Sequence, residues 1–159
     1  MDDKKIIVCD TEKCTGCEIC EYVCSVYKEK TVNWSKSRIR HVRIEPTFDI
    51  AIACRKCESP ICIKACPRDA VTVVEDGSIR IDKDKCNGCG WCIEACNFGA
   101  LKLSWGSKVA FACDFCEDSG GYPRCVELCP YEALEFSTLN QVGHESGKKA
   151  FMRIIAELE

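Results

Sequence analysis

The chain has 159 residues, of which 17 are cysteine, 22 are lysine or arginine and 25 are aspartate or glutamate. A chain of this length forms one or two small domains with a modest hydrophobic core. The near balance of charge, without a basic cluster, excludes the electrostatic footprint of a nucleic-acid-binding protein.

The first stretch, MDDKKIIVCD, predicts a strand in which Cys9 is a small buried residue rather than a metal ligand. Its acidic start and short apolar run are not those of a secretory signal, and an odd cysteine count argues against a secreted disulfide scaffold. No segment approaches the roughly 20 consecutive apolar residues that a membrane-spanning helix needs. We therefore expect a cytoplasmic protein without a transmembrane segment.

The other cysteines fall into four groups, each of which begins with CxxC and ends with CxxxC. The groups are Cys14, Cys17, Cys20, Cys24; Cys54, Cys57, Cys62, Cys66; Cys86, Cys89, Cys92, Cys96; and Cys113, Cys116, Cys125, Cys129. The end of each group predicts a short helical turn, at residues 20–27, 62–66, 92–96 and 125–129.

The segments between and after the groups predict further elements. RIRHVRIE alternates as a strand does and is expected to expose His41. β-Rich runs flank turn residues in 70–82 and again in 100–113, which predicts two hairpins. Trp34 and Trp105 are expected to pack. The tail, 141–159, predicts an amphipathic helix with Phe151 and Ile154 on its apolar face, which covers the chain's own fold or docks a partner.

Cysteine thiolate is a soft ligand, so dense cysteine groups with only two histidines indicate iron–sulfur clusters or zinc. Structural zinc usually takes two CxxC pairs that are a dozen or more residues apart. A CxxCxxCxxxC run instead wraps three cysteines around one larger cluster and carries the fourth away on a helix. A structural zinc protein stays an alternative.

The groups also form a repeat. EKCTGCEICEYVC and DKCNGCGWCIEAC share a glycine before the second cysteine, Gly16 and Gly88, whereas the second and fourth groups end in Pro67 and Pro130. We expect the glycines to let backbone N–H groups approach the sulfurs. Trp91, and the apolar residue before each fourth cysteine, would exclude water from the clusters or fill the core. The latter residues are Val23, Ala65, Ala95 and Leu128.

The CxxCxxCxxxC runs resemble those of bacterial ferredoxins, in which three cysteines hold one 4Fe-4S cluster and the fourth ligates its neighbour. Two runs have longer internal spacings, from Cys54 to Pro67 and from Cys113 to Pro130. They restrict the resemblance to a smaller group of ferredoxin-like proteins. Over residues 6–139 the chain resembles the four-cluster electron-transfer subunits of several enzyme complexes. These are formate dehydrogenases, dimethyl sulfoxide reductase-type enzymes, hydrogenase complexes, carbon monoxide dehydrogenase partners and tungsten-dependent aldehyde oxidoreductases.

The crossed pairing of that family implies four ligand sets. They are Cys54, Cys57, Cys62 with Cys96; Cys86, Cys89, Cys92 with Cys66; Cys14, Cys17, Cys20 with Cys129; and Cys113, Cys116, Cys125 with Cys24. The implied fold is α+β, with two pseudo-repeated bacterial ferredoxin-like modules that each hold two 4Fe-4S clusters. The inner module would span 46–108, and the outer module would combine 1–45 with 109–140.

The resemblance implies a non-catalytic subunit that relays electrons through four 4Fe-4S clusters. Its expected partners are a second electron carrier and a large catalytic subunit, which is a tungsten or molybdenum pterin enzyme, a hydrogenase or a carbon monoxide dehydrogenase. No recognisable catalytic motif competes with this interpretation. A free-standing polyferredoxin that shuttles electrons between enzymes stays an alternative.

Overall fold

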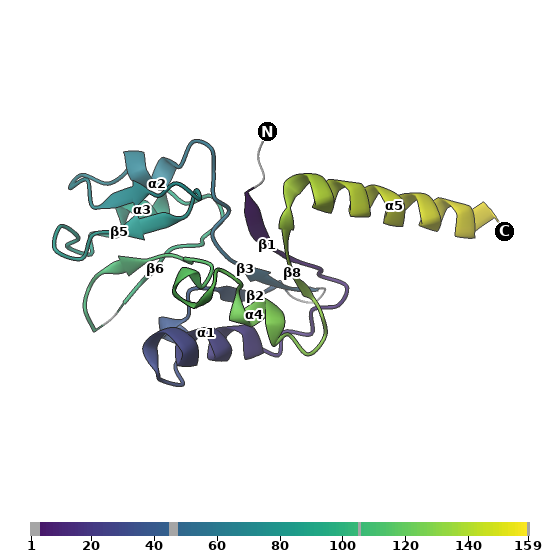
Figure 1. The fold of residues 1–159 in the computed structure, drawn as a ribbon, viewed down its shortest axis with the longest axis horizontal. Helices are drawn as coiled ribbons and strands as arrows, with labels where there is room; N and C mark the ends of the chain where they lie inside the picture. The colour runs from purple at the N-terminus through teal and green to yellow at the C-terminus, as the bar shows by residue number, and fades with distance from the viewer. Residues whose placement is uncertain (1–3, 45–47, 105, 159) are drawn as a thin grey trace.

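The computed structural model describes residues 4–44, 48–104 and 106–158 as a mixed fold of helices and strands (Figure 1). In these ranges the strands form four two-stranded antiparallel sheets. The pairs are β1 (Lys5–Cys9) with β8 (Leu134–Thr138), β2 (Arg40–Ile44) with β3 (Phe48–Ile52), β4 (Val71–Val73) with β5 (Ile79–Ile81), and β6 (Lys102–Leu103) with β7 (Ala110–Phe111). The two hairpins predicted within 70–82 and 100–113 are confirmed, as is the strand that holds Cys9.

Each cysteine group leads into a helix, as predicted. The helices are α1 (Ile19–Glu29), α2 (Ile61–Lys64), α3 (Trp91–Glu94) and α4 (Arg124–Glu127), and two 3₁₀ turns lie at Trp34–Lys36 and Glu117–Ser119. α1 is longer than predicted. Ser25 stands in α1 where the groups of α2 and α4 have Pro67 and Pro130, and proline would remove a backbone donor from the helix interior. Fully buried, Ser25 donates to the Tyr22 carbonyl and accepts the Asn33 N–H.

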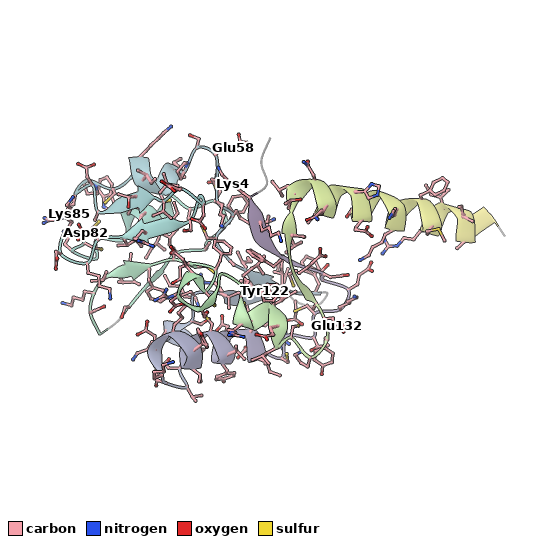
Figure 2. The ribbon with its side chains drawn as sticks, in the orientation of Figure 1. Lys4, Glu58, Asp82, Lys85, Tyr122 and Glu132 are labelled. Atoms are coloured by element: carbon pink, nitrogen blue, oxygen red, sulfur yellow. The ribbon has the colours of Figure 1, made fainter. Side chains whose placement is uncertain are left out.

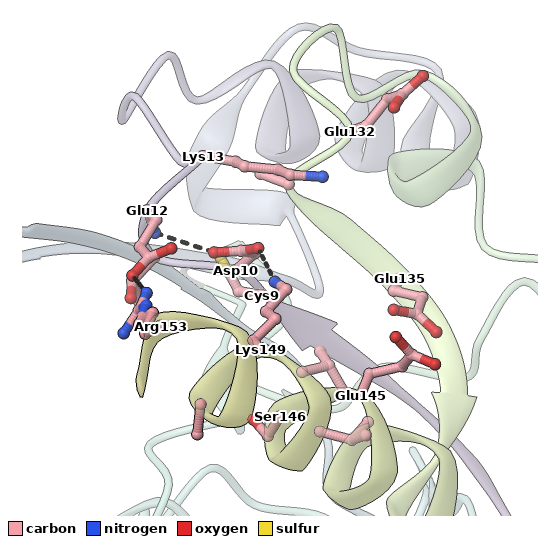
Figure 3. Close-up of a pocket in the computed structure, with 15 residues that line it drawn as sticks. Cys9, Asp10, Glu12, Lys13, Glu132, Glu135, Glu145, Ser146, Lys149 and Arg153 are labelled. Carbon is pink, nitrogen blue, oxygen red and sulfur yellow. Dashed lines mark hydrogen bonds and ion pairs between the residues drawn. The ribbon is translucent and has the colours of Figure 1, made fainter. Parts of the chain in front are cut away.

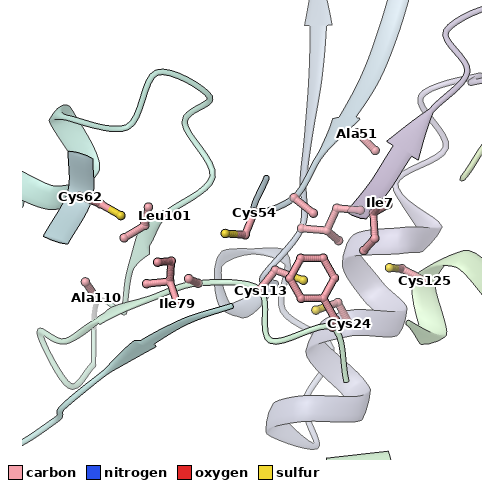
Figure 4. Packing of buried hydrophobic residues seen from close by; sticks show 14 of the residues in the cluster. Ile7, Cys24, Ala51, Cys54, Cys62, Ile79, Leu101, Ala110, Cys113 and Cys125 are labelled. Atoms are coloured by element: carbon pink, nitrogen blue, oxygen red, sulfur yellow. The ribbon is translucent and has the colours of Figure 1, made fainter. Parts of the chain in front are cut away.

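The packing brings together groups that are far apart in the chain. α1 packs against α4, and α2 packs against α3, while β1 pairs with β8 so that Ile7 lies opposite Phe136. Buried cysteines and aliphatic side chains fill the space between these elements. Figure 4 shows this core reaching from Cys62 to Cys125.

The last helix, α5 (Leu139–Leu158), follows β8 directly and runs away from the rest of the molecule (Figure 1). Phe151 and Ile154, predicted for its apolar face, are both exposed. No helix in the described ranges is both long enough and apolar enough to cross a bilayer.

Predictions for His41 and Trp34 were wrong, and core filling, one of the two alternatives for Trp91, is excluded. His41 is not exposed, because β3 places Asp49 beside it and leaves 9% of the His41 side chain accessible. Trp34 and Trp91 do not pack in the core, since they are 61% and 62% exposed. Trp105, and residue 46, where the inner module was expected to begin, lie outside the described residues.

Candidate iron–sulfur centres

One pocket is lined by the four cysteines Cys14, Cys17, Cys20 and Cys129; we call it the Cys129 site. The first three lie on the loop that enters α1 and on its first turn, and Cys129 lies just beyond α4. His41 and Ala51, from the β2–β3 hairpin, also line the pocket. Contact between α1 and α4 thus brings cysteines of the first and last groups to one place.

A second pocket is lined by Cys66, Cys86, Cys89 and Cys92; we call it the Cys66 site. Its cysteines come from the ends of α2 and α3, which pack together. This pocket and the Cys129 site enclose about 320 and 360 Å³ of empty space, open in part to solvent.

The other cysteines affect one another's pKa and so lie near one another in two further sets. We call Cys54, Cys57, Cys62 and Cys96 the Cys96 site, and Cys24, Cys113, Cys116 and Cys125 the Cys24 site. Burial, and then the nearby charges of Cys54 and Cys96, raise the pKa of Cys62 to about 11. In the same way burial, then the charges of Cys113 and Cys24, hold the pKa of Cys125 well above its usual range.

Backbone N–H groups point at the last cysteine of every group. The Sγ atoms of Cys66, Cys96 and Cys129 each accept a bond from the N–H of an alanine four residues on, at 3.3, 3.4 and 3.3 Å. The first group lacks that alanine because α1 continues, and Cys24 Sγ accepts the N–H of Arg38 at 3.2 Å instead. Such bonds stabilise negative charge on sulfur. The CxxxA spacing was not used in the sequence prediction, although it is visible in three groups.

Gly16 and Gly88 lie where a side chain would not fit. Both have positive φ, +67° and +73°. A Cβ on Gly88 would lie 2.2 Å from the carbonyl oxygen of Lys108, and one on Gly16 would lie 2.5 Å from side-chain atoms of Arg43 and Asp49. Glycine is therefore needed for close approach at both cysteine loops.

The sites follow one another through the molecule. The charge of Cys54 contributes to the raised pKa of Cys113, and that of Cys20 contributes to the raised pKa of Cys125. The Cys24 site therefore lies between the Cys96 site and the Cys129 site. Lys85, next to Cys86, and Glu132, just past Cys129, lie at opposite sides of the body in Figure 2. The Cys66 and Cys129 sites are thus the two ends of the series.

The apolar residues beside the cysteines differ in their exposure. Of those before the fourth cysteines, Leu128 is 54% exposed, whereas Val23, Ala65 and Ala95 are partly buried. The residues after the third cysteines of three groups are also partly buried and pack against the core; they are Ile63, Ile93 and Val126.

The donor sets suit iron–sulfur clusters. Each site offers four thiols, and a 4Fe-4S cluster takes one cysteine on each of its four irons. Within residues 4–44, 48–104 and 106–158, no three histidine, cysteine or carboxylate side chains are grouped so as to hold a single ion.

Cys9 lies outside the four sets. Its Sγ accepts the N–H of Ala51 at 3.3 Å, and burial raises its pKa to about 12. It lines a groove of about 690 Å³ between α5 and the start of the first cysteine group (Figure 3). Two ion pairs cross this groove, from Lys149 to Asp10 at 2.8 Å and from Arg153 to Glu12.

Family models match two parts of the chain. One described as a 4Fe-4S dicluster domain matches residues 47–139, and one described as a 4Fe-4S binding domain matches residues 11–27. These ranges include all four cysteine groups.

Several known proteins are similar to the chain. The B subunit of the anaerobic dimethyl sulfoxide reductase of Escherichia coli (strain K12) is 34% identical over 158 residues, with 89% of this chain and 77% of the relative covered. The polyferredoxin-like subunit of the aliphatic sulfonate oxidoreductase of Pyrococcus furiosus is 34% identical over 138 residues, covering 84% and 78%. The thiosulfate reductase electron transfer subunit PhsB of Salmonella typhi is 29% identical over 152 residues, covering 89% and 79%.

A solved structure shares the fold. One polypeptide of the active site complex BamBC of benzoyl coenzyme A reductase superposes with a TM-score of 0.50 at 26% identity, covering 97% of this chain and 95% of that one. With the family matches and the relatives above, this likeness identifies the chain as a member of the 4Fe-4S dicluster family of ferredoxin-like electron-transfer subunits.

Proposed function

We propose that the chain is the electron-transfer subunit of a redox enzyme complex and relays electrons through four 4Fe-4S clusters. The observation that carries the proposal is that two pockets are each lined by four cysteines from two different groups of the sequence. The other eight ligands are proposed to form the remaining two sets in the same way, which the mutual charge effects of these cysteines support. Each bound cluster would accept and release one electron. The chain would hold the clusters, keep water from them and supply N–H donors to their sulfurs; it would not catalyse a reaction itself.

The proposed ligands are the cysteines of the four sites, in the crossed pairing. Contact between α2 and α3 supports the inner module at 46–108, which would hold the Cys66 and Cys96 sites. Pairing of β1 with β8, and contact between α1 and α4, support an outer module built from 1–45 and 109–140. Two pseudo-repeated modules with two clusters each follow from this division.

The proposed path runs from the Cys66 site through the Cys96 and Cys24 sites to the Cys129 site, or in reverse. Cys89 and Cys17, at its two ends, are exposed. Exposed ends allow one partner to approach each terminal cluster. All four cysteines of the Cys24 site are buried, which keeps water from that cluster, whereas Cys57 of the Cys96 site is exposed.

The proposed partners are a large catalytic subunit and a second electron carrier. Relatives named as subunits of dimethyl sulfoxide, thiosulfate and aliphatic sulfonate enzymes support a catalytic partner of the tungsten or molybdenum pterin class. A hydrogenase or a carbon monoxide dehydrogenase is the other possibility from the sequence. A cytoplasmic location belongs to the proposal, because free thiols persist in a reducing compartment.

The tail helix 141–159 is proposed to dock the catalytic subunit. Phe151 and Ile154 are exposed on α5 rather than packed on the chain's own fold. The two ion pairs with Asp10 and Glu12 hold α5 beside the Cys129 site, so that a subunit bound there would lie near a terminal cluster. Changing Phe151 to Asp should release the partner in gel filtration and leave the cluster spectra unchanged. Lys148→Gln is the matched control on the same helix, and cluster loss in F151D would assign α5 to the internal fold instead.

Ligand substitution tests the proposed function. Cys24→Ser should remove the cluster of the Cys24 site and spare that of the Cys129 site, although Cys24 belongs to the same sequence group as Cys14. Cys9→Ser is the matched control and should keep the full iron and sulfide content. Loss from the Cys129 site in C24S, with the Cys24 site intact, would contradict the crossed pairing.

Analysis of the purified protein separates the alternatives. Iron and acid-labile sulfide with cluster absorption support the proposal, whereas zinc without sulfide would make the chain a structural zinc protein. Purification from the native source as a lone monomer, with no large subunit, would favour the free polyferredoxin.

A further inference from the structure

An ion-pair network beside the Cys24 site joins two distant segments of the chain; Glu29 extends it by pairing with Arg38 at 3.6 Å. Lys28, near the end of α1, places its Nζ 3.0 Å from a carboxylate oxygen of Asp114 and 2.5 Å from one of Asp118. Arg38 forms a second ion pair with Asp114. Asp114 lies between Cys113 and Cys116 in the sequence, and its other oxygen accepts the N–H of Cys116 at 3.2 Å. These charges therefore stand next to the cysteine loop itself.

The charges differ in their exposure to water. Only 3% of the Lys28 side chain is accessible, against 64% of the Asp118 side chain. Water and salt screen an exposed charge strongly and a buried one much less. The positive charge of Lys28 therefore acts on the Cys24 site more strongly than the negative charge of Asp118 does.

Contacts with the loop show how near these cations are to the ligands. Lys28 and Arg38 both pair with Asp114, the carboxylate that accepts the N–H of Cys116. The backbone N–H of Arg38 donates to Cys24 Sγ, while Arg38 Nε is buried and has no hydrogen-bond partner among the described atoms. Both cations are thus one carboxylate away from the cysteine loop of the Cys24 site.

We propose that Lys28 sets the reduction potential of the cluster at the Cys24 site, by holding a buried positive charge beside its ligands. This inference rests on the proposed function. The electron that the site receives comes from the neighbouring redox carrier, adds one negative charge and brings no proton. A buried cation stabilises that added charge, so Lys28 raises the potential, and Asp118 lowers it. Lys28 is a positioning residue for charge, since it touches no reacting atom.

The test compares the two partners of one ion pair, Lys28 and Asp118. The inference predicts that their substitutions shift the midpoint potential of the cluster in opposite directions. Redox titration monitored by electron paramagnetic resonance, on the anaerobically purified full chain, gives the midpoint potential of each cluster. The signal of the Cys24 site is the one lost in Cys24→Ser. Lys28→Gln should move this midpoint to more negative values, and Asp118→Asn should move it to more positive values by a smaller amount. Lys28→Arg should restore the starting value, and the distant Lys148→Gln should have no effect.

A purely structural role predicts a different pattern, because both substitutions break the same ion pair and would disturb the site in the same direction. Shifts of the same sign, or no shift in a fully loaded Lys28→Gln protein, overturn the inference. If Lys28→Gln loses the cluster, Asp118→Asn and Lys28→Arg decide whether the inference holds. A negative shift of the midpoint potential in Asp118→Asn, or no shift, then overturns the inference. A wild-type protein without a cluster at this site contradicts the proposed function instead.

Discussion

Replacement of Gly88 by alanine should destabilise the protein far more than the same replacement at Gly90. Both glycines lie in the third cysteine loop and both have positive φ, +73° and +84°. They differ in their surroundings. A Cβ on Gly88 would lie 2.2 Å from the carbonyl oxygen of Lys108, whereas a Cβ on Gly90 would meet nothing within 4 Å. The pair therefore separates backbone strain from steric overlap.

The costs follow from these surroundings. At either position alanine loses about 1–2 kcal/mol to the left-handed conformation and recovers about 0.4–1 kcal/mol by restricting the unfolded chain. Gly90→Ala should thus cost about 1 kcal/mol. Gly88→Ala adds a clash with a backbone atom, for which overpacking values of about 1–3 kcal/mol are typical. Gly16→Ala should fall between them, because its Cβ would meet the movable ends of the Arg43 and Asp49 side chains.

Thermal unfolding under anaerobic conditions measures the difference. In a chain of this size about 1 kcal/mol corresponds to a midpoint shift of about 2–4 °C, so G90A should lower the midpoint by that amount and G88A by about two to four times as much. Cluster loss makes unfolding irreversible, so all variants need the same heating rate. Equal shifts for G88A and G90A would refute the argument from close approach to Lys108, since backbone strain alone would then account for both.

Three other predictions concern the metal, the thiols and a buried ion pair. Chelation of iron under reducing conditions should unfold the chain, as seen by circular dichroism, because its small core is built around the sites; cooperative thermal unfolding of the metal-free form would contradict this. Burial raises the pKa of Cys20 to about 12 and that of Cys62 to about 11, so both are protonated thiols at neutral pH in the absence of metal. Cluster assembly must therefore release protons and become more favourable as pH rises, and a pH-independent yield of reconstitution would count against that. Glu21→Ala should lower the free energy of unfolding by about 3–5 kcal/mol, because it leaves the buried ammonium of Lys102 without its carboxylate partner at 3.4 Å. Glu18→Ala, at an exposed carboxylate, should change the unfolding midpoint little.

Features that depend on neighbouring residues could be predicted from the sequence. The CxxC loops, the short helices after them and the hairpin around Gly77 each follow from local spacing and turn chemistry. The strands β3 and β8 were missed, although FDIAI and ALEFS alternate over a few residues. Strands β2 and β1 were predicted. Their pairing with β3 and β8 could not be inferred from such short runs, because β pairing is decided by burial on one face.

Long-range packing explains why the environment of single residues was harder to predict. His41 lies in a strand that alternates in polarity, yet its ring is 2.7 Å from Asp49 on β3 and lines the Cys129 site. Glu21 looks like a surface residue of α1, but it is buried because Lys102 arrives from β6. Asp49 is 8 residues from His41, across the β2–β3 hairpin, and Lys102 is 81 residues from Glu21. Local patterns assign such residues to the surface, and only the pairing or packing of other segments changes that assignment.

Chain connectivity suggests that the inner sites form before the outer ones. α2 and α3 are separated by about 30 residues and α1 and α4 by about 100, so closing the outer pair costs about 1 kcal/mol more chain entropy. The outer sites also rest on a core that they share with the inner ones, from Cys62 through Cys113 to Cys125. Cys62→Ser should therefore lower iron content beyond one cluster, whereas Cys125→Ser, at the equivalent place on α4, should leave both inner clusters in place. Equal losses in the two variants would show that the modules assemble independently of their order along the chain.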